Sequence, residues 1–146
     1  MDTTVIWKLN QNRLSEQPFV TVKNVKVIRD EIKFSDLIPD AEIIILDRPS
    51  TTSLEACMTS KPLFVLLAGK NWDSIPEKLL GKRAVIAYTP EDLRESIDNY
   101  FSHDVYSADV HNNEYVTEYG CYLDDGRSSE RATAELLKII DENTVR

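Results

Sequence analysis

Glycine, cysteine and clustered basic residues are all scarce in this chain, and each shortage excludes a class of function. Its 146 residues include only four glycines and two cysteines. A Walker loop or a glycine-rich dinucleotide fingerprint needs several closely spaced glycines, and neither motif is present. Cys57 and Cys121 lie far apart and match no metal-ligand spacing. We therefore expect no metal site and no bound cofactor.

Charge and hydropathy exclude further classes of function. The formal net charge is −8 and the only adjacent basic pair is Lys82–Arg83, so the clustered cations that nucleic acids require are missing. No apolar run approaches the roughly 20 residues that span a bilayer, and residues 1–10 lack the pattern of a signal peptide. The composition predicts one globular domain in the cytoplasm that does not bind nucleic acid.

Short apolar runs alternate with helical patterns, which predicts an α/β fold. We expect a three-layer sandwich with a Rossmann-like, mainly parallel sheet in residues 2–89, over which the remaining helices close. Continuous apolar runs such as 43–46 are typical of strands buried on both faces of such a sheet. The expected strands are Val5–Leu9, Val25–Ile28, Ile43–Leu46, Leu63–Leu67 and Ala84–Ala87. The expected helices are Phe34–Ile38, Thr52–Ser60, one beginning at Thr89, Asn113–Tyr119 and Ser128–Glu142.

The apolar faces of these helices indicate the core. In the 52–60 helix, Leu54, Cys57 and Met58 share one face. The helix that begins at Thr89 directs Leu93, Ile97 and Phe101 inward, and the last helix has the stripe Leu136, Ile139 and Ile140. Tyr106, Tyr115, Tyr119 and Tyr122 are expected to form a satellite core with hydrated hydroxyls.

The stretch AEIIILDRPSTTSLEACMTSKPLFVLL, residues 41–67, is the most informative part of the sequence. It reads as a buried strand, a turn, a short helix and a second buried strand. The helix begins with four hydroxyl side chains in succession, Ser50, Thr51, Thr52 and Ser53. Because a helix N-terminus offers unpaired N–H groups and a partial positive charge, it favours phosphate binding. The pattern therefore predicts a phosphorylated ligand, most simply a nucleotide, at the carboxyl ends of parallel strands.

A purely structural interpretation of the same residues remains open. Thr52 and Glu55 have the spacing of a capping box, in which each side chain bonds the backbone N–H of the other residue. Capping needs only one hydroxyl, so four exceed that need. Glu55 can cap, or accept hydrogen bonds from a ribose diol, or do both.

Two charged residues flank this helix. Asp47 follows the first strand, where it is expected to accept hydrogen bonds from the turn amides of Ser50 or Thr51; a phospho-acceptor of the receiver type is the alternative. Lys61 is expected to stabilise the helix C-terminus. His103 and His111 match no metal pattern, and no catalytic residue can be named.

Two stretches of the chain resemble a known family. DRPSTTSLEACMTSKPLFVL, residues 47–66, resembles the donor-binding segment of GT-B glycosyltransferases of bacterial surface-polysaccharide and capsule assembly. NNEYVTEYGCYLDDGRSSERATAELLKII, residues 112–140, resembles the C-terminal part of the same family, where a similar motif precedes the closing helix.

The resemblance implies a fold like the C-terminal domain of GT-B enzymes, whose partner is a nucleotide-diphosphate sugar. It implies that Ser50, Thr51, Thr52 and Ser53 hold the diphosphate and that Glu55 holds the ribose. Residues 1–146 are then one domain of a partial chain that lacks the acceptor-binding half. That half, or a partner subunit, would complete the enzyme and supply any peripheral membrane association, and the isolated chain is expected to be inactive. The alternative is a non-catalytic, receiver-like regulatory or interaction domain.

Overall fold

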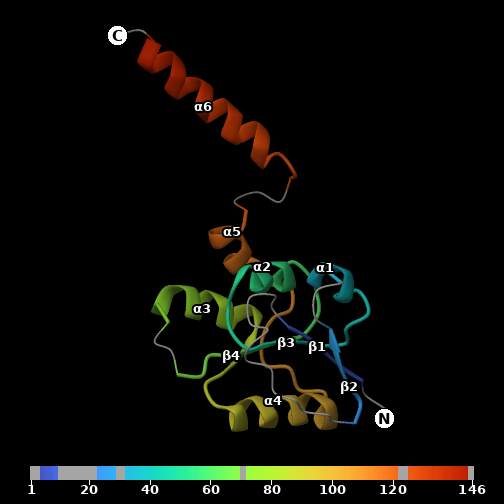
Figure 1. Cartoon of the computed structure of the whole chain (residues 1–146). Coiled ribbons are helices and arrows are strands. Elements are labelled where there is room, and N and C mark those ends of the chain that lie inside the picture. Colours follow the sequence, from blue (N-terminus) through green and yellow to red (C-terminus); the bar gives the residue numbers. More distant parts are fainter. Residues whose placement is uncertain (1–3, 10–22, 29–31, 70–71, 122–124, 145–146) are drawn as a thin grey trace. The chain divides into compact units, whose positions relative to one another are not determined.

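The computed structural model describes residues 4–9, 23–28, 32–69, 72–121 and 125–144. Its contacts divide the chain into two compact units, residues 1–41 and residues 42–146. In both units every strand pairing between described residues is parallel, and helices accompany the strands (Figure 1). The predicted α/β class with parallel, Rossmann-like strand pairing is confirmed, but the strands form two separate sheets and not the single sheet expected in residues 2–89.

The first unit contains a two-stranded parallel sheet and one short helix. Strand β1 (Val5–Lys8) pairs with β2 (Val25–Ile28), in a register that places Val5 opposite Val25. Helix α1 (Phe34–Leu37) is the single turn predicted before Pro39, since proline cannot continue a helix. Both strands and the helix therefore form where the sequence predicts them.

The second unit is built on a parallel sheet with the order β3-β4-β5. Its strands are β3 (Ile44–Leu46), β4 (Leu63–Leu66) and β5 (Val85–Ala87). The central strand β4 is entirely apolar, and Leu63, Phe64 and Val65 are at most 1% exposed. β4 therefore forms the centre of the core, as its continuous apolar run predicts.

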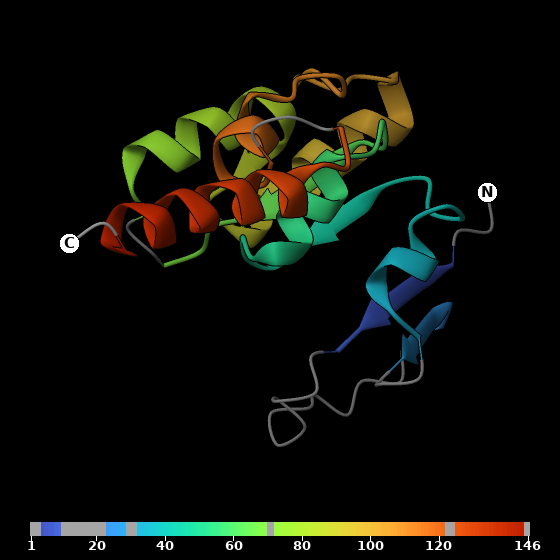
Figure 2. The ribbon, with the colours of Figure 1, turned by 90° about the horizontal axis from the view of Figure 1, so that it is seen from above.

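Helices cover both faces of this sheet. Helix α2 (Thr51–Cys57) connects β3 to β4, and α3 (Ser74–Arg83) connects β4 to β5. Figure 1 shows α2 and α3 on one side of the strands and α4 (Pro90–His103) on the other. Helix α5 (Glu114–Tyr119) packs against α2 and α3, an arrangement that Figure 2 shows from above. The second unit thus has the three layers that the sequence predicts.

Helix α4 begins as predicted but directs a different aromatic residue towards the sheet. Thr89 Oγ1 accepts a hydrogen bond from Asp92 N, and Asp92 Oδ2 accepts one from Thr89 N, each at 3.1 Å. Phe101, expected to point inward, is 41% exposed. Tyr100 packs edge-on against Phe64 instead, with ring centroids 6.0 Å apart. The capping residues therefore fix the start of the helix but not which aromatic side chain contacts the sheet.

Three further expectations about the core are wrong. Ile45 is 46% exposed, so β3 is buried on one face and not on both. Met58 is 58% exposed because α2 ends at Cys57 and Met58 is only its C-cap. The predicted stripe of α6 (Ser128–Thr144) is exposed as well, with Leu136 at 61%. Each residue was assigned to the core from its apolar run or its helical spacing, and neither pattern shows what covers the residue.

The C-terminal end of α5 requires a glycine. Gly120 is the C-cap of α5, where the sequence predicts that the helix stops. A Cβ atom at Gly120 would lie 2.9 Å from Val116 O and 3.4 Å from Leu54 Cδ2. Because the first distance is too short for a real Cβ atom, any other residue at this position would force the end of α5 to shift, whereas the second is an ordinary contact with α2.

A buried arginine lies at the centre of the second unit. Arg83, the last residue of α3, is 0% exposed. Its Nη2 donates to Thr59 O at 2.5 Å, Lys61 O at 2.9 Å and Ala56 O at 3.4 Å. These three carbonyls end α2 and lead into β4, where helix carbonyls lack intrahelical partners. Arg83 therefore provides a cation at the C-terminal end of α2, the end that Lys61 was expected to stabilise by its position next to the helix.

Tyr106 completes this cluster from the segment that follows α4. Its hydroxyl accepts from Leu63 N at 3.0 Å and lies 2.9 Å from Arg83 O, to which it donates. The ring packs edge-on against Phe64 with centroids 5.7 Å apart. Burial raises the pKa of Tyr106. Its hydroxyl is thus bonded within the protein and not hydrated as expected; Tyr122 lies outside the described residues.

Replacing Arg83 with methionine should strongly destabilise the second unit. The substitution keeps an apolar stem but removes the guanidinium donor from the half-buried carbonyls of Thr59 and Lys61, which costs about 3 kcal/mol. Urea unfolding followed by circular dichroism measures the loss. The matched control is Arg94→Met on the exposed surface of α4, for which we expect a change within about 0.5 kcal/mol. Equal effects of the two substitutions would contradict the role assigned to Arg83.

Candidate functional site

The predicted phosphate-binding turn lies between β3 and α2, at the carboxyl end of a parallel strand. Ser50 is the N-cap of α2 and has extended backbone geometry. Its Oγ accepts from Thr52 N at 3.3 Å, and its N–H donates to Ser53 Oγ at 2.9 Å. Ser50 and Ser53 therefore form the reciprocal capping arrangement of this helix.

The expected capping box between Thr52 and Glu55 is wrong. The helix begins at Thr51, one residue before the predicted start, so the cap moves to Ser50 and its partner to Ser53. Thr52 lies within the first turn, and its Oγ1 is 2.6 Å from Ser50 Oγ. Glu55 is exposed and lies beyond the positions that can cap. The Glu55 carboxylate therefore has no capping role that would compete with ligand binding.

The four hydroxyls of this turn do not have equal access to solvent. Ser53 is 0% exposed, and its hydroxyl is engaged by Ser50 N. Ser50 and Thr51 are exposed, and Thr52 is half-buried. A ligand at this helix end would therefore meet Ser50, Thr51 and Thr52, whereas Ser53 supports the turn from inside.

Thr51 and Glu55 lie on one face of α2. They are four residues apart, which places their side chains one above the other on a helix. Both residues are exposed. This face thus presents a hydroxyl at the helix N-terminus and a carboxylate one turn further along, within reach of two neighbouring groups of a single ligand.

The loop that precedes Ser50 contains an ion pair that the sequence did not reveal. Arg48 Nη2 lies 3.8 Å from Asp47 Oδ2. The side chain of Asp47 is 80% exposed, and the hydrogen bonds found among the described residues do not include the expected one to Ser50 or Thr51. Asp47 therefore faces solvent beside Arg48. The Asp47 carboxylate offsets the charge of Arg48, so the pair adds no net charge to this loop.

Cys57 is a core residue, as its place in the helix pattern predicts. It is 6% exposed, and burial raises the pKa of its thiol to about 11, an effect that the positive charge of Arg83 partly offsets. The reactive thiolate is thus suppressed at neutral pH. Cys121 is free and half-buried.

A separate hollow lies along α3 and β5. Its volume is about 440 Å³, and its lining includes Trp72, Glu77 and Tyr88. Tyr88 donates a hydrogen bond to Glu77 Oε1 at 2.5 Å, and this bond raises the pKa of Tyr88. None of Ser50, Thr51, Thr52 or Glu55 lines this hollow.

In the ranges that the structure describes, no three His, Cys, Asp or Glu side chains group closely enough to hold a metal ion, and no helix is both long and apolar enough to cross a bilayer. Comparison of the chain with protein-family models, curated proteins and solved structures gave no match.

The revised cap gives a prediction that separates the observed Ser50–Ser53 cap from the expected Thr52–Glu55 box. Ser50→Ala should lower the free energy of unfolding by about 1 kcal/mol, the usual cost of losing an N-cap. Glu55→Ala should change it by less than about 0.5 kcal/mol, because Glu55 is exposed and does not cap. Urea unfolding of both variants measures the difference. The reverse order of effects would restore the Thr52–Glu55 box.

The two cysteines should react at very different rates. At pH 7.5 iodoacetamide should modify Cys121 first, because Cys57 is buried and its pKa is raised to about 11. Peptide mass spectrometry during a time course measures both rates. Because the folded protein favours the neutral Cys57 thiol, this contribution to stability is complete below its usual pKa of 9.0 and is lost as the pH rises through about 11. Faster modification of Cys57 than of Cys121 would show that α2 does not stay packed.

Proposed function

We propose that this chain is the nucleotide-diphosphate-sugar-binding half of a GT-B-type glycosyltransferase that acts in bacterial surface-polysaccharide biosynthesis. The observation that supports the proposal most is the exposed face of α2, on which Thr51 and Glu55 lie one turn apart. In this proposal the diphosphate sits at the helix N-terminus and the ribose beside Glu55. The sequence resemblance noted above points to the same residues.

The chemistry of the turn fits a diphosphate. First-turn amides and the hydroxyls of Ser50, Thr51 and Thr52 favour negative charge at the N-terminal end of α2. Negative charge grows on the diphosphate as the glycosidic bond to it breaks. The same groups would therefore stabilise the leaving group electrostatically, whereas the acceptor and any catalytic base would be supplied by another half or subunit.

The Glu55 carboxylate has the chemistry to recognise a ribose. An ionised carboxylate only accepts hydrogen bonds, and a ribose diol offers two donors to it. Because Glu55 is exposed and has no capping role, binding a diol would break no bond of the helix cap. The acid would thus select nucleotides over simple phosphates.

An NMR amide titration of the chain with UDP, CDP, GDP and ADP tests the proposal. One nucleotide should give saturable shifts centred on residues 50–55. Thr51→Val should weaken binding of that nucleotide and of inorganic pyrophosphate, each about fivefold, because a hydrogen bond contributes about 1 kcal/mol. Glu55→Gln should weaken the nucleotide by a similar factor but not pyrophosphate.

The control is Glu91→Gln, which changes an exposed acid in the first turn of α4 and should leave both affinities unchanged. The absence of shifts at residues 50–55 with every nucleotide would contradict the proposal, as would sugar transfer by the chain alone. A mass increase with a small phosphodonor that Asp47→Asn abolishes would instead favour the receiver-like alternative, which the exposed position of Asp47 after β3 permits.

A further inference from the structure

Strand β5 has backbone groups that point away from the rest of its sheet. Ala87 O accepts a hydrogen bond from Leu67 N at 2.8 Å, so the backbone of Ala87 faces β4. Because backbone groups alternate between the two edges of a strand, the N–H and C=O of Ile86 face the opposite edge. Among the strands that the structure describes, none lies on that side of β5. The sheet therefore offers a donor and an acceptor of one residue to a further strand.

The hollow along α3 and β5 lies at this same edge. It touches both Val85 and Ile86, whose side chains point to opposite faces of the sheet. It also touches Ser107, from the segment after α4, and Trp72, from the segment before α3. Its volume of about 440 Å³ is within the range of ligand sites. The outer edge of β5 is therefore part of the wall of a recess and not part of a flat surface.

A glycine keeps this recess open beside Ile86. Gly81 lies within α3 and lines the hollow. A Cβ atom at Gly81 would meet Ile86 Cγ1 at 3.7 Å, which is an ordinary contact, so packing does not require a glycine here. Glycine also destabilises the interior of a helix relative to alanine. Gly81 thus leaves space in the hollow that the stability of α3 alone would not favour.

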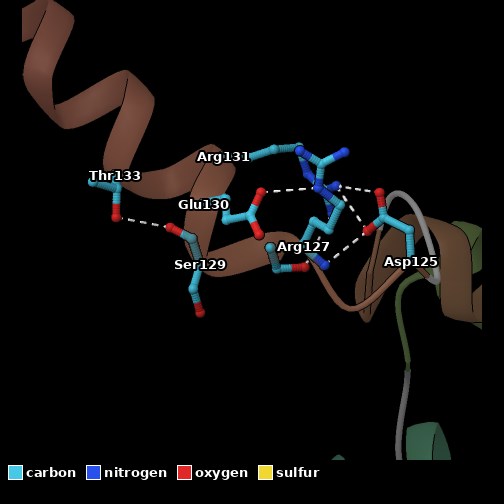
Figure 3. Close-up of polar contacts among 7 residues, drawn as sticks. Asp125, Arg127, Ser129, Glu130, Arg131 and Thr133 are labelled. Atoms are coloured by element: carbon cyan, nitrogen blue, oxygen red, sulfur yellow. Dashed lines mark hydrogen bonds and ion pairs between the residues drawn. The ribbon is translucent and has the colours of Figure 1, made fainter.

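The exposed apolar stripe of α6 has no comparable groups. The backbone of a helix is hydrogen-bonded within the helix, and two carboxylates beside the stripe are already paired. Glu130 accepts from Arg127 Nε at 2.9 Å (Figure 3), and Glu135 accepts from Lys138 Nζ at 2.6 Å. These contacts identify no partner for α6, whereas the donor and acceptor of Ile86 match an extended backbone.

Shape and size decide between a second copy of this chain and another protein at this edge. A second copy would bring the same recess to the contact, and two recesses are not complementary to each other. Strand β5 has three residues and spans about 10 Å, which is too short for the area that a stable dimer buries. An extended peptide is narrow enough to enter the hollow and has the backbone groups that Ile86 needs.

We propose that an extended segment of another protein adds to the outer edge of β5 as a further strand. Its backbone exchanges hydrogen bonds with the N–H and C=O of Ile86, and these bonds provide affinity. One of its apolar side chains enters the hollow, where Trp72, Ala84 and Ile86 form part of the lining, and this pocket provides specificity. This surface is independent of the proposed nucleotide site, since none of the residues of that site lines the hollow.

An NMR amide titration of the full chain tests the proposal. The probe is a short peptide of alternating valine and threonine, with a lysine at each end for solubility. Saturable binding should shift the Ile86 amide downfield and slow its hydrogen exchange, because the amide gains an acceptor. Methylation of every valine amide, or of every threonine amide, removes the donors from one edge of the peptide only. One of these two peptides should bind about fivefold more weakly, because it lacks a hydrogen bond, and the other should bind like the unmodified probe.

Two substitutions of one glycine test the role of the hollow. Gly81→Leu should weaken binding of the unmodified probe about tenfold or more, because the leucine fills space that the peptide needs. The matched control is Gly81→Ala, whose Cβ makes an ordinary contact and should leave affinity unchanged. Circular dichroism verifies that both variants fold. Equal weakening by the two methylations, no shift of the Ile86 amide, or no effect of Gly81→Leu would overturn the proposal. Dimerisation that Gly81→Leu abolishes, seen by light scattering, would also overturn it, because the occupant would then be a second copy.

Discussion

The second unit depends on a buried positive charge that has carbonyl groups as its main partners. Arg83 ends α3 immediately before β5, and its guanidinium collects three carbonyls from the end of α2 and the residues that lead into β4. Tyr106 adds a hydroxyl that bonds both Arg83 and the first residue of β4. An arginine is always charged, so its burial is tolerated only where such dipoles replace water.

This constraint explains why a seven-residue helix can serve as a platform. A helix as short as α2 is unstable alone, because nucleation fixes several residues for few hydrogen bonds. Arg83 anchors its C-terminal end, and the Ser50–Ser53 cap closes its N-terminal end. The face of α2 that contains Thr51 and Glu55 is exposed to solvent. The proposed nucleotide site is therefore the part of α2 that neither anchor uses.

The sequence predicts the positions of the elements well and their tertiary contacts less well. Proline, hydroxyl caps and continuous apolar runs are local signals, so α1, β4 and the start of α4 appear where expected. The role of Arg83 could not be foreseen, because a charged residue beside Lys82 is typical of an exposed helix end and its partners lie more than 20 residues away. The sequence pattern also does not show which elements pack against a residue. For that reason it could not predict the exposure of Ile45, Met58 and the α6 stripe.

For the candidate site, too, the sequence predicts the position but not the contacts. The hydroxyl-rich turn was found from sequence, but a shift of one residue in the helix start exchanged the cap of Thr52 and Glu55 for that of Ser50 and Ser53. Of the residues predicted to bind the nucleotide, Ser53 is therefore buried in the cap, whereas Glu55 is exposed and has no capping role. Arg48 was missed because nothing in its sequence neighbourhood distinguishes it from any loop cation.

Amide hydrogen exchange of the wild-type chain and the Arg83→Lys variant tests this account most directly. Lysine keeps the charge but lacks the fork that reaches several carbonyls at once. The account predicts that exchange in residues 54–61 accelerates in the variant, whereas the amides of β4 and β5 remain protected. Unchanged protection of α2 in a folded variant would contradict the claim that Arg83 holds this helix, and with it the platform for the proposed site.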